Sequence, residues 1–187
     1  MKLDELESST TSTDSGKHLE NISNMLDQII EETQTLTYDL GSPTLYELGL
    51  KSAIEEWLSE EIEQKHNIST FFESEGAPKS LSEDISGFLF RSARELTVNA
   101  VKHGKAQNIK VSLQWKEDII RICVDDDGVG FELSEAGASK DKKSGYGLFS
   151  IKEHLSHIGG YIEIKSQPHH GTQVVLVAPS KGNVVGT

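Results

Sequence analysis

The sequence has a single cysteine, no long apolar run and little positive charge, and each shortage excludes a class of protein. The one cysteine, Cys123, rules out a disulfide framework and indicates a reducing, cytoplasmic setting. No apolar run approaches the length that crosses a bilayer and no signal peptide is visible, so we expect a soluble chain. The same features would fit the cytoplasmic part of a larger, membrane-bound receptor.

Acidic side chains outnumber basic ones. Lys plus Arg is 18 and Asp plus Glu is 30, which gives a net charge of −12. Sequence-independent nucleic-acid binding depends on cations that neutralise phosphates, so no nucleic-acid partner is expected. A nucleotide ligand would, for the same reason, need local positive charge and a metal ion to offset long-range repulsion.

The first 43 residues differ from the rest of the chain. Residues 1–17 are small and polar and cannot bury enough surface to become ordered, so they are predicted to be a disordered tail. Residues 18–43 carry a heptad pattern that predicts a long helix. This helix would either pack on its own domain or form half of a dimeric helical hairpin, with residues 19–40 as the homodimer seam. Its apolar positions are Leu19, Ile22, Leu26, Ile29, Leu36 and Leu40.

Residues 44–180 predict one α+β domain, which residues 181–187 follow as a C-terminal tail. Gly41-Ser42-Pro43 ends the first helix, and helical and strand-like patterns then alternate. Strands follow strands directly in two hairpins, so we expect a two-layer α/β sandwich with a mixed, mostly antiparallel sheet. Three helices are expected: one over 49–64, a central one that begins at a Ser80/Glu83 capping box and stops at Gly104, and one over 148–158. The expected strands are 68–72, 108–115, 118–125, 161–166 and 172–178.

Two motifs on either side of the first hairpin carry polar side chains. On the central helix, Glu95, Asn99 and His103 recur every four residues and form one stripe, which is either a solvated face or a binding edge. The run Asp125-Asp126-Asp127 closes the second strand and could be an acidic turn or a cation site. The Gly128-Val129-Gly130 that follows argues against a plain turn, because glycines let backbone approach a ligand closely.

A third motif, Gly145-Tyr146-Gly147-Leu148, opens a predicted helix. Free backbone N–H groups and the positive end of the helix dipole converge at such a terminus, which makes it a cradle for phosphate. A lone Gly-x-Gly is common in loops. Residues 132–144, however, are nearly free of apolar side chains and include Lys140, Lys142 and Lys143, so a mobile, lysine-bearing loop precedes the motif and favours phosphate binding.

In this order, and with a closing Gly171-Thr172, the motifs resemble the ATP-binding catalytic domain of bacterial sensor histidine kinases. That domain has the Bergerat-type ATPase fold, shared with gyrase, a heat-shock chaperone family and mismatch-repair proteins. The resemblance covers roughly residues 45–179. The preceding link, Tyr38 to Leu50, is similar to the one between the second dimerisation helix and the ATP domain in one kinase subfamily. The resemblance implies ATP and Mg²⁺ as ligands.

The resemblance also implies a role for each matching residue. Glu95 would orient or deprotonate the nucleophile as a general base, Asn99 would ligate Mg²⁺ through its carbonyl oxygen, and Asp126 would accept the amino group of adenine. Arg91, one turn before Glu95, either pairs with it or is a solvated arginine. The other residues expected to bind the nucleotide are Lys102, His103, Gly128, Gly130, Gly145, Tyr146, Gly147, Leu148, Gly171 and Thr172.

One departure from the family bears on mechanism. A complete histidine kinase carries a phosphoacceptor histidine followed by an acidic residue, and none of the seven histidines here has that surrounding. The chain therefore resembles a second dimerisation helix plus an ATP domain. Such a fragment would bind ATP and ADP without phosphorylating itself, and its partners would be a phosphoacceptor helix and, downstream, a response regulator.

Two alternatives remain open. An anti-sigma-factor-type serine kinase has the same ATPase fold, but such kinases are compact and lack the heptad helix. A non-catalytic nucleotide-binding interaction module is the other alternative, and the intact Glu95, Asn99 and Lys102 argue against it.

Overall fold

The computed structural model describes residues 42–132 and 146–180. The chain divides into two compact units, Met1–Ser42 and Pro43–Thr187, and all described residues except Ser42 belong to the second. The predicted tail at 1–17, the heptad helix as far as residue 41, residues 133–145 of the lysine-bearing loop and the C-terminal tail lie outside the described residues.

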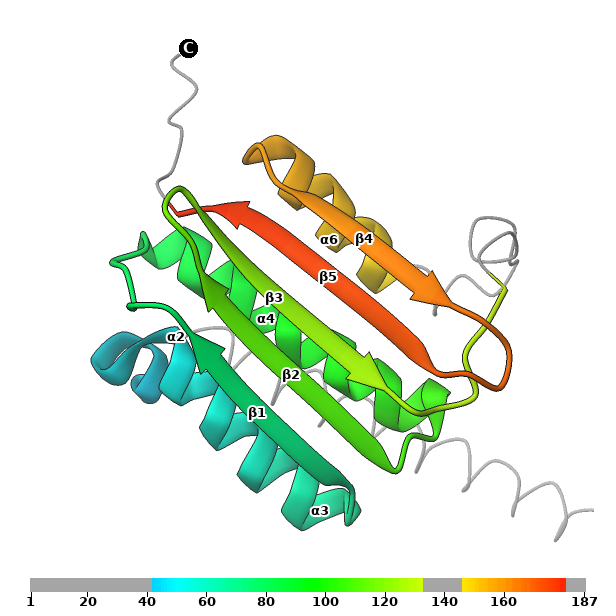
Figure 1. The fold of residues 1–187 in the computed structure, drawn as a ribbon. Helices are drawn as coiled ribbons and strands as arrows, with labels where there is room; N and C mark the ends of the chain where they lie inside the picture. The colour runs from blue at the N-terminus through cyan, green and yellow to red at the C-terminus, as the bar shows by residue number, and fades with distance from the viewer. Residues whose placement is uncertain (1–41, 133–145, 181–187) are drawn as a thin grey trace, which may run out of the picture. The chain divides into compact units, whose positions relative to one another are not determined.

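A five-stranded sheet forms one layer of this domain, in the order β1-β2-β3-β5-β4 (Figure 1). β1 pairs in parallel with β2, and the other three pairings are antiparallel. The prediction of an α+β fold with a mixed, mostly antiparallel sheet is confirmed. The strands are β1 (Ser69–Glu75), β2 (Asn108–Trp115), β3 (Ile119–Asp126), β4 (Tyr161–Ser166) and β5 (Thr172–Pro179).

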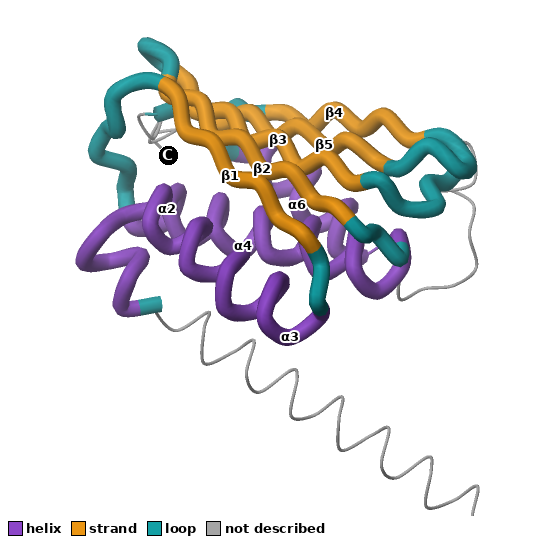
Figure 2. Tube along the Cα trace, turned by 60° about the horizontal axis from the view of Figure 1, so that its bottom comes forward, coloured by secondary structure: helices purple, strands orange, loops and turns teal. Residues whose placement is uncertain are grey.

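The helices form the second layer and lie on one face of the sheet (Figure 2). α4 is the central helix of this layer (Figure 2) and contacts both α2 and β3, so its apolar stripe is buried as the amphipathic pattern predicts. The helical segments are α2 (Pro43–Trp57), which continues through a π-helical turn, η1 (Leu58–Glu63), into α3 (Gln64–His66); α4 (Glu83–Asn99), which ends in a second π-helical turn, η2 (Ala100–Gly104); and α6 (Tyr146–His157).

Two predicted boundaries of the central helix are wrong, and the helix expected from Gly49 has a short helical segment before it. α2 spans Pro43–Trp57, but Gly49 breaks it with φ 83° and ψ 175°, so the predicted helix follows this break, and Pro43 suits the first turn of the segment before it. The N-cap of α4 is Ser82 rather than Ser80, because the Ser82 hydroxyl accepts the Ile85 N–H at 3.3 Å. Gly104 lies within the last turn, and the left-handed residue that ends it is Lys105, with φ 52°.

The core lies between the helices and the inner face of the sheet, where side chains of neighbouring strands form rows. Val124 of β3, Val174 of β5 and Ile164 of β4 make one such row, since each is the direct partner of the next. These side chains belong to the apolar core. Two residues further along the same face, the row is polar: Asp126, Thr172 and Ser166.

Candidate functional site

The polar row Asp126–Thr172–Ser166 lies where β3 and β4 end and β5 begins (Figure 1). Asp126 pairs with Thr172, and Thr172 pairs with Ser166, so the three side chains point to the same, helix-facing side of the sheet. All three are half-buried. Polar groups have thus replaced the apolar side chains of the core at this end of the inner face.

The three adjacent carboxylates have different partners, so they do not form a joint cation site. Asp125 accepts a hydrogen bond from Nε2 of Gln173 at 2.7 Å on the outer face. Asp127 accepts the backbone N–H groups of Gln107 and Asn108 at 2.8 and 2.9 Å, together with Nδ2 of Asn108 at 2.7 Å. Within residues 42–132 and 146–180, no group of three or more His, Cys, Asp and Glu side chains could hold a metal ion.

Asp126 is the member of this run that faces the interior. Burial raises the pKa of its carboxyl group above the usual aspartate value, and the hydrogen bonds from the backbone N–H groups of Gly128 and Thr172 oppose that rise. The Gly128 N–H lies 2.9 Å from Oδ1. A partly desolvated carboxylate of this kind gains from a ligand that donates N–H groups to it.

The glycines around Asp126 are required by contacts within the protein. A Cβ on Gly128 would lie 2.4 Å from the carbonyl oxygen of Gly104 and 2.8 Å from Oδ1 of Asp126. One on Gly171 would meet the backbone oxygen of Asp126. A Cβ on Gly130, whose φ is 59°, would meet the backbone oxygens of Gln167 and Gly171. The turn after β3 is therefore packed backbone against backbone, a reason for these glycines that the sequence pattern did not reveal.

Glu95 and Asn99 lie together near the start of α6. Asn99 donates its Nδ2 hydrogen to Oε1 of Glu95 at 3.2 Å, and both side chains are half-buried. The carboxylate occupies the space where a side chain on Gly147 would begin, since a Cβ there would contact Glu95 Oε1. The Glu95 end of the predicted stripe thus lies against the first turn of α6, where the positive end of the helix dipole favours a negative charge.

The remaining predicted residues fall into three groups. Lys102 and His103 are exposed on the π-helical turn η2 that ends the central helix. Leu148 is partly buried and packs against the core. Gly145 and the side chain of Tyr146 lie outside the described residues.

Arg91 forms no ion pair with Glu95 in the described part of the chain. Its side chain is exposed and lies over Gly87, one turn earlier on α4. A Cβ added to that glycine would be 3.3 Å from Nη1 of Arg91. The solvated-arginine interpretation therefore fits.

Sequence reasoning missed Ser166, and it named Asp127 only as part of the acidic run. Ser166 accepts the backbone N–H of Phe131 at 2.8 Å and contacts Oγ1 of Thr172 at 2.9 Å. Asp127 joins the turn after β3 to the loop before β2. The sequence contains a weak signal that could have placed Ser166 in the site. This serine ends a predicted strand five residues before Gly171-Thr172, and in a hairpin it therefore lies opposite that pair.

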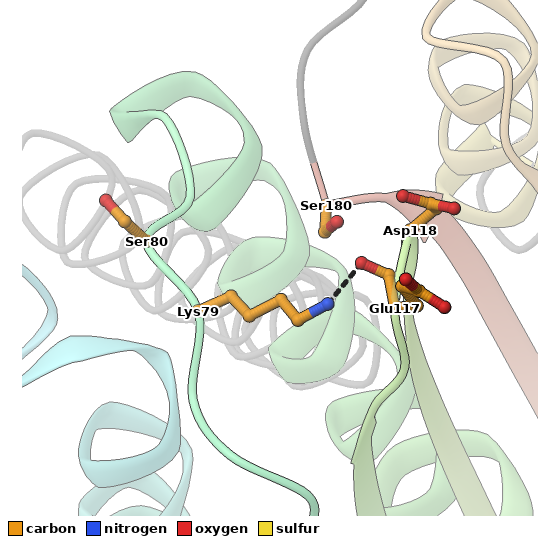
Figure 3. A pocket seen from close by; sticks show the side chains of 5 residues that line it. All are labelled: Lys79, Ser80, Glu117, Asp118 and Ser180. Carbon is orange, nitrogen blue, oxygen red and sulfur yellow. Dashed lines mark hydrogen bonds between the residues drawn. The ribbon is translucent and has the colours of Figure 1, made fainter.

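A shallow cavity of about 460 Å³ lies at the opposite end of β3, near the β2–β3 hairpin. Figure 3 shows that the amino group of Lys79 reaches the backbone at Glu117. Lys79 Nζ also donates to the carbonyl oxygen of Lys116 at 2.6 Å, so this lysine ties the loop before α4 to the hairpin. The cavity shares none of the predicted site residues; its lining consists of Lys79, Ser80, Glu117, Asp118 and Ser180.

Comparison with known proteins identifies the family. The sequence profile of the histidine kinase-, DNA gyrase B- and HSP90-like ATPases matches residues 85–182, which is more than half of the chain. The catalytic domain of the histidine kinase ThkA matches the structure with a TM-score of 0.57 over 71% of this chain and 92% of that domain; at 19% identity, this likeness shows the fold. The chain therefore belongs to this ATPase family, and it carries an ATP-binding domain of the histidine-kinase type.

Several curated relatives are sensor kinases. The chain is 31% identical to an uncharacterised sensor-like histidine kinase of Chloroflexus aurantiacus, with 86% of this chain and 27% of the relative aligned. It is 31% identical to the sensor histidine kinase LiaS of Bacillus subtilis (87% and 43%) and 28% identical to the oxygen sensor histidine kinase NreB of Staphylococcus carnosus (89% and 46%). The chain thus spans less than half the length of these relatives. Among the described helices, none is both long and apolar enough to cross a membrane.

Proposed function

We propose that the chain is the catalytic portion of a two-component sensor histidine kinase and transfers the γ-phosphate of ATP to a histidine on a separate dimerisation helix. One observation carries the proposal: the C-terminal half of the central helix joins two polar sites. At its end, Gly104 lies against Oδ1 of Asp126, and nine residues earlier Glu95 lies against Gly147. Nine helical residues span roughly 13 Å, which suits an extended ligand with a base at one end and phosphates at the other.

The adenine would bind at the Asp126 end. Its exocyclic amino group is an N–H donor, and the half-buried Asp126 carboxylate is an acceptor whose burial raises its pKa. A charge-assisted hydrogen bond between them would offset that desolvation. Thr172, the direct neighbour of Asp126 on the same face, would supply the second polar contact to the base. Gly128, Gly130 and Gly171 would support this end by holding the turn in place.

The phosphates would bind at the other end, around the start of α6. Its backbone N–H groups and helix dipole favour anions, and the residues expected to contribute are Gly145, Tyr146, Gly147 and Leu148. Lys102 and His103 are exposed on the turn that ends the central helix. Because helix side chains tilt toward the N-terminus, the long Lys102 side chain would extend back toward the phosphates and add positive charge, and His103 would line their site. Mg²⁺ would fit here as well: Asn99 directs its amide nitrogen to Glu95, which leaves its carbonyl oxygen as a hard ligand for a metal that neutralises phosphate charge.

Glu95 would act on the nucleophile. Its Oε1 is held by Asn99, and the carboxylate lies beside the first turn of α6, where the γ-phosphate is expected. A carboxylate in that place can accept a hydrogen bond from the incoming imidazole and orient its free nitrogen in line with the phosphorus. In this proposal, residues 44–180 form the catalytic domain, residues 19–40 a dimerising helix, and the phosphoryl group passes on to a response regulator.

Calorimetry with ATP and Mg²⁺ tests the nucleotide site. Asp126→Asn is expected to weaken binding by about 1.5–3 kcal/mol, the range for a lost charged hydrogen bond. Asp125→Asn is the matched control, since that carboxylate contacts Gln173 on the outer face and its removal should leave affinity unchanged. Equal affinities for wild type and Asp126→Asn would refute the adenine assignment.

A transfer assay tests the kinase activity. A helical hairpin with an acceptor histidine is incubated with the chain, γ-labelled ATP and Mg²⁺, and we expect acid-labile label on the hairpin and none on the chain. Glu95→Gln should lower the rate by about 10²–10⁴-fold and leave ATP affinity nearly unchanged, because a base acts on the nucleophile and not on adenine. Acid-stable label on a partner protein would indicate a serine kinase instead.

A further inference from the structure

Ser166 contacts three groups at the end of the sheet, and none of its roles follows from the motifs. It accepts the Phe131 backbone N–H at 2.8 Å and donates to the carbonyl oxygen of Gly171 at 3.2 Å. Its third partner is Oγ1 of Thr172 at 2.9 Å, where either hydroxyl can be the donor. One half-buried serine hydroxyl therefore joins the turn after β3 to both sides of the β4–β5 hairpin.

The number of protons decides the direction of the third bond. A serine hydroxyl has one hydrogen to donate and two lone pairs to accept with. The bond to Gly171 uses the hydrogen, because a carbonyl oxygen can only accept, and the bond from Phe131 uses one lone pair. Toward Thr172 only the second lone pair is left. Thr172 is therefore the donor in that bond, and its own hydrogen points to Ser166, away from Asp126.

The consequence is a binding edge that only accepts hydrogen bonds. With its hydrogen engaged by Ser166, the Thr172 hydroxyl offers lone pairs to the proposed base, next to the carboxylate of Asp126 in the same row. We infer that Ser166 is a positioning residue that fixes this edge as acceptor-only and thereby selects 6-amino over 6-oxo purine nucleotides. This inference rests on the proposed binding of a purine base at Asp126.

The chemistry of the two base types makes the selection. An amino group at position 6 has two N–H bonds, one for Asp126 and one for Thr172, directly or through one water. A 6-oxo group is an acceptor, so it would face two acceptors with no hydrogen between them, a contact that costs binding energy. Without the Ser166 hydroxyl, Thr172 can turn its hydrogen toward the proposed base and donate to a 6-oxo group or to Asp126. Discrimination would then weaken.

The test compares the affinities of ATP and inosine triphosphate, which carries a 6-oxo group, by calorimetry with Mg²⁺. Wild type should prefer ATP by at least about a hundredfold. In Ser166→Ala this preference should fall by about three- to tenfold, the scale of one neutral hydrogen bond. A purely structural role for Ser166 would weaken both nucleotides alike and leave the ratio unchanged, so an unchanged ratio overturns the inference.

Three further variants sharpen the experiment. Ser166→Thr restores a hydroxyl and should restore the wild-type ratio. Thr172→Val combined with Ser166→Ala should show the same ratio as Thr172→Val alone, because Ser166 acts through Thr172; a further drop in the double variant would contradict this. If Ser166→Ala does not fold, Ser166→Cys keeps the volume with a weaker donor and acceptor, and its ratio should also fall.

The outcomes separate this inference from the proposed function. If wild type binds neither nucleotide, the site at Asp126 is wrong and the inference falls with it. If wild type and Ser166→Ala both prefer ATP to the same degree, and Asp126→Asn weakens ATP binding, the proposed function stands and the role of Ser166 is refuted.

Discussion

The side-chain amide of Asn99 donates a hydrogen bond to Oε1 of Glu95, one helical turn earlier, at 3.2 Å. This bond orients two groups at once: it turns the carbonyl oxygen of Asn99 away from Glu95 and holds the Glu95 carboxylate beside Gly147. The proposed metal ligand and the proposed base are therefore coupled through a single contact. Removal of either side chain should leave a different part of the reaction impaired.

Asn99→Ala is expected to remove the metal-dependent part of nucleotide affinity. Calorimetry in Mg²⁺ should show ATP binding weakened by about ten- to hundredfold, the range for a lost contact to a charged group, while affinity in a metal chelator stays unchanged. Glu95→Gln serves as the control and should keep the full effect of Mg²⁺. An equal loss with and without the metal would argue against Asn99 as a ligand.

Gly128→Ala should destabilise the domain and abolish nucleotide binding. The added Cβ would lie 2.4 Å from the backbone oxygen of Gly104, and this contact can be relieved only if backbone moves. We expect a loss of about 1–3 kcal/mol in the free energy of unfolding, measured by chemical denaturation. Gly159→Ala is a matched control: its φ of 78° costs about 1 kcal/mol, but nothing lies within 4 Å of the new Cβ, so ATP affinity should not change.

The raised pKa of Asp126 predicts opposite pH effects on binding and on stability. ATP affinity should decrease as pH falls through this pKa, because the protonated group no longer presents a carboxylate to adenine. The stability of the ligand-free domain should instead decrease as pH rises from the ordinary aspartate range through the raised pKa, since the folded state holds the proton more tightly.

Asp126→Asn is therefore expected to raise the melting temperature at neutral pH while it weakens ATP binding. The rise should be small, a few degrees at most, because the carboxylate is only half-buried and solvent screens much of its charge. A thermal melt of both proteins at neutral and acidic pH measures it. A lower melting temperature for Asp126→Asn at neutral pH would contradict the prediction.

Asp127→Ala should lower stability through the loop that precedes β2. Three hydrogen bonds from Gln107 and Asn108 hold the pKa of Asp127 below the usual aspartate value, the Asn108 side chain contributing most. The group is largely solvated, so the loss should be only about 1 kcal/mol by denaturation at neutral pH.

The pH dependence of this effect has a definite sign. A lowered carboxyl pKa stabilises the fold above the ordinary value, and the contribution disappears as pH falls through the lowered value. The difference between wild type and Asp127→Ala should shrink accordingly in acid. Asp125→Ala, which removes one bond to Gln173, should cost less. A difference that stays constant into strong acid would show that the carboxylate charge is not involved.

Local patterns in the sequence determined most of the elements and the family. The alternation Ile109, Val111, Leu113 predicted β2 with its observed bounds, because a strand with one buried face must alternate. The order of the motifs around Glu95, Asp126 and Gly147 identified the ATPase family, since each motif is contiguous in the chain. The helix ends were less predictable: the sequence offers both Ser80 and Ser82, and only the structure shows that Ser82 accepts the Ile85 N–H and that Lys105, not Gly104, is the left-handed residue after η2.

Only the tertiary structure decided how the site is built. It showed that Asp125 and Asp126 have different environments, because a strand directs successive side chains to opposite faces, and that Asp127, just past the strand, binds the loop before β2. It also placed Glu95 against Gly147, 52 positions apart by their residue numbers, and Ser166 against Phe131. Contacts of this kind depend on how strands and helices are arranged in space. No pattern of neighbouring residues contains that information, because the pairing of distant segments is fixed only when the sheet and the helices pack around one core.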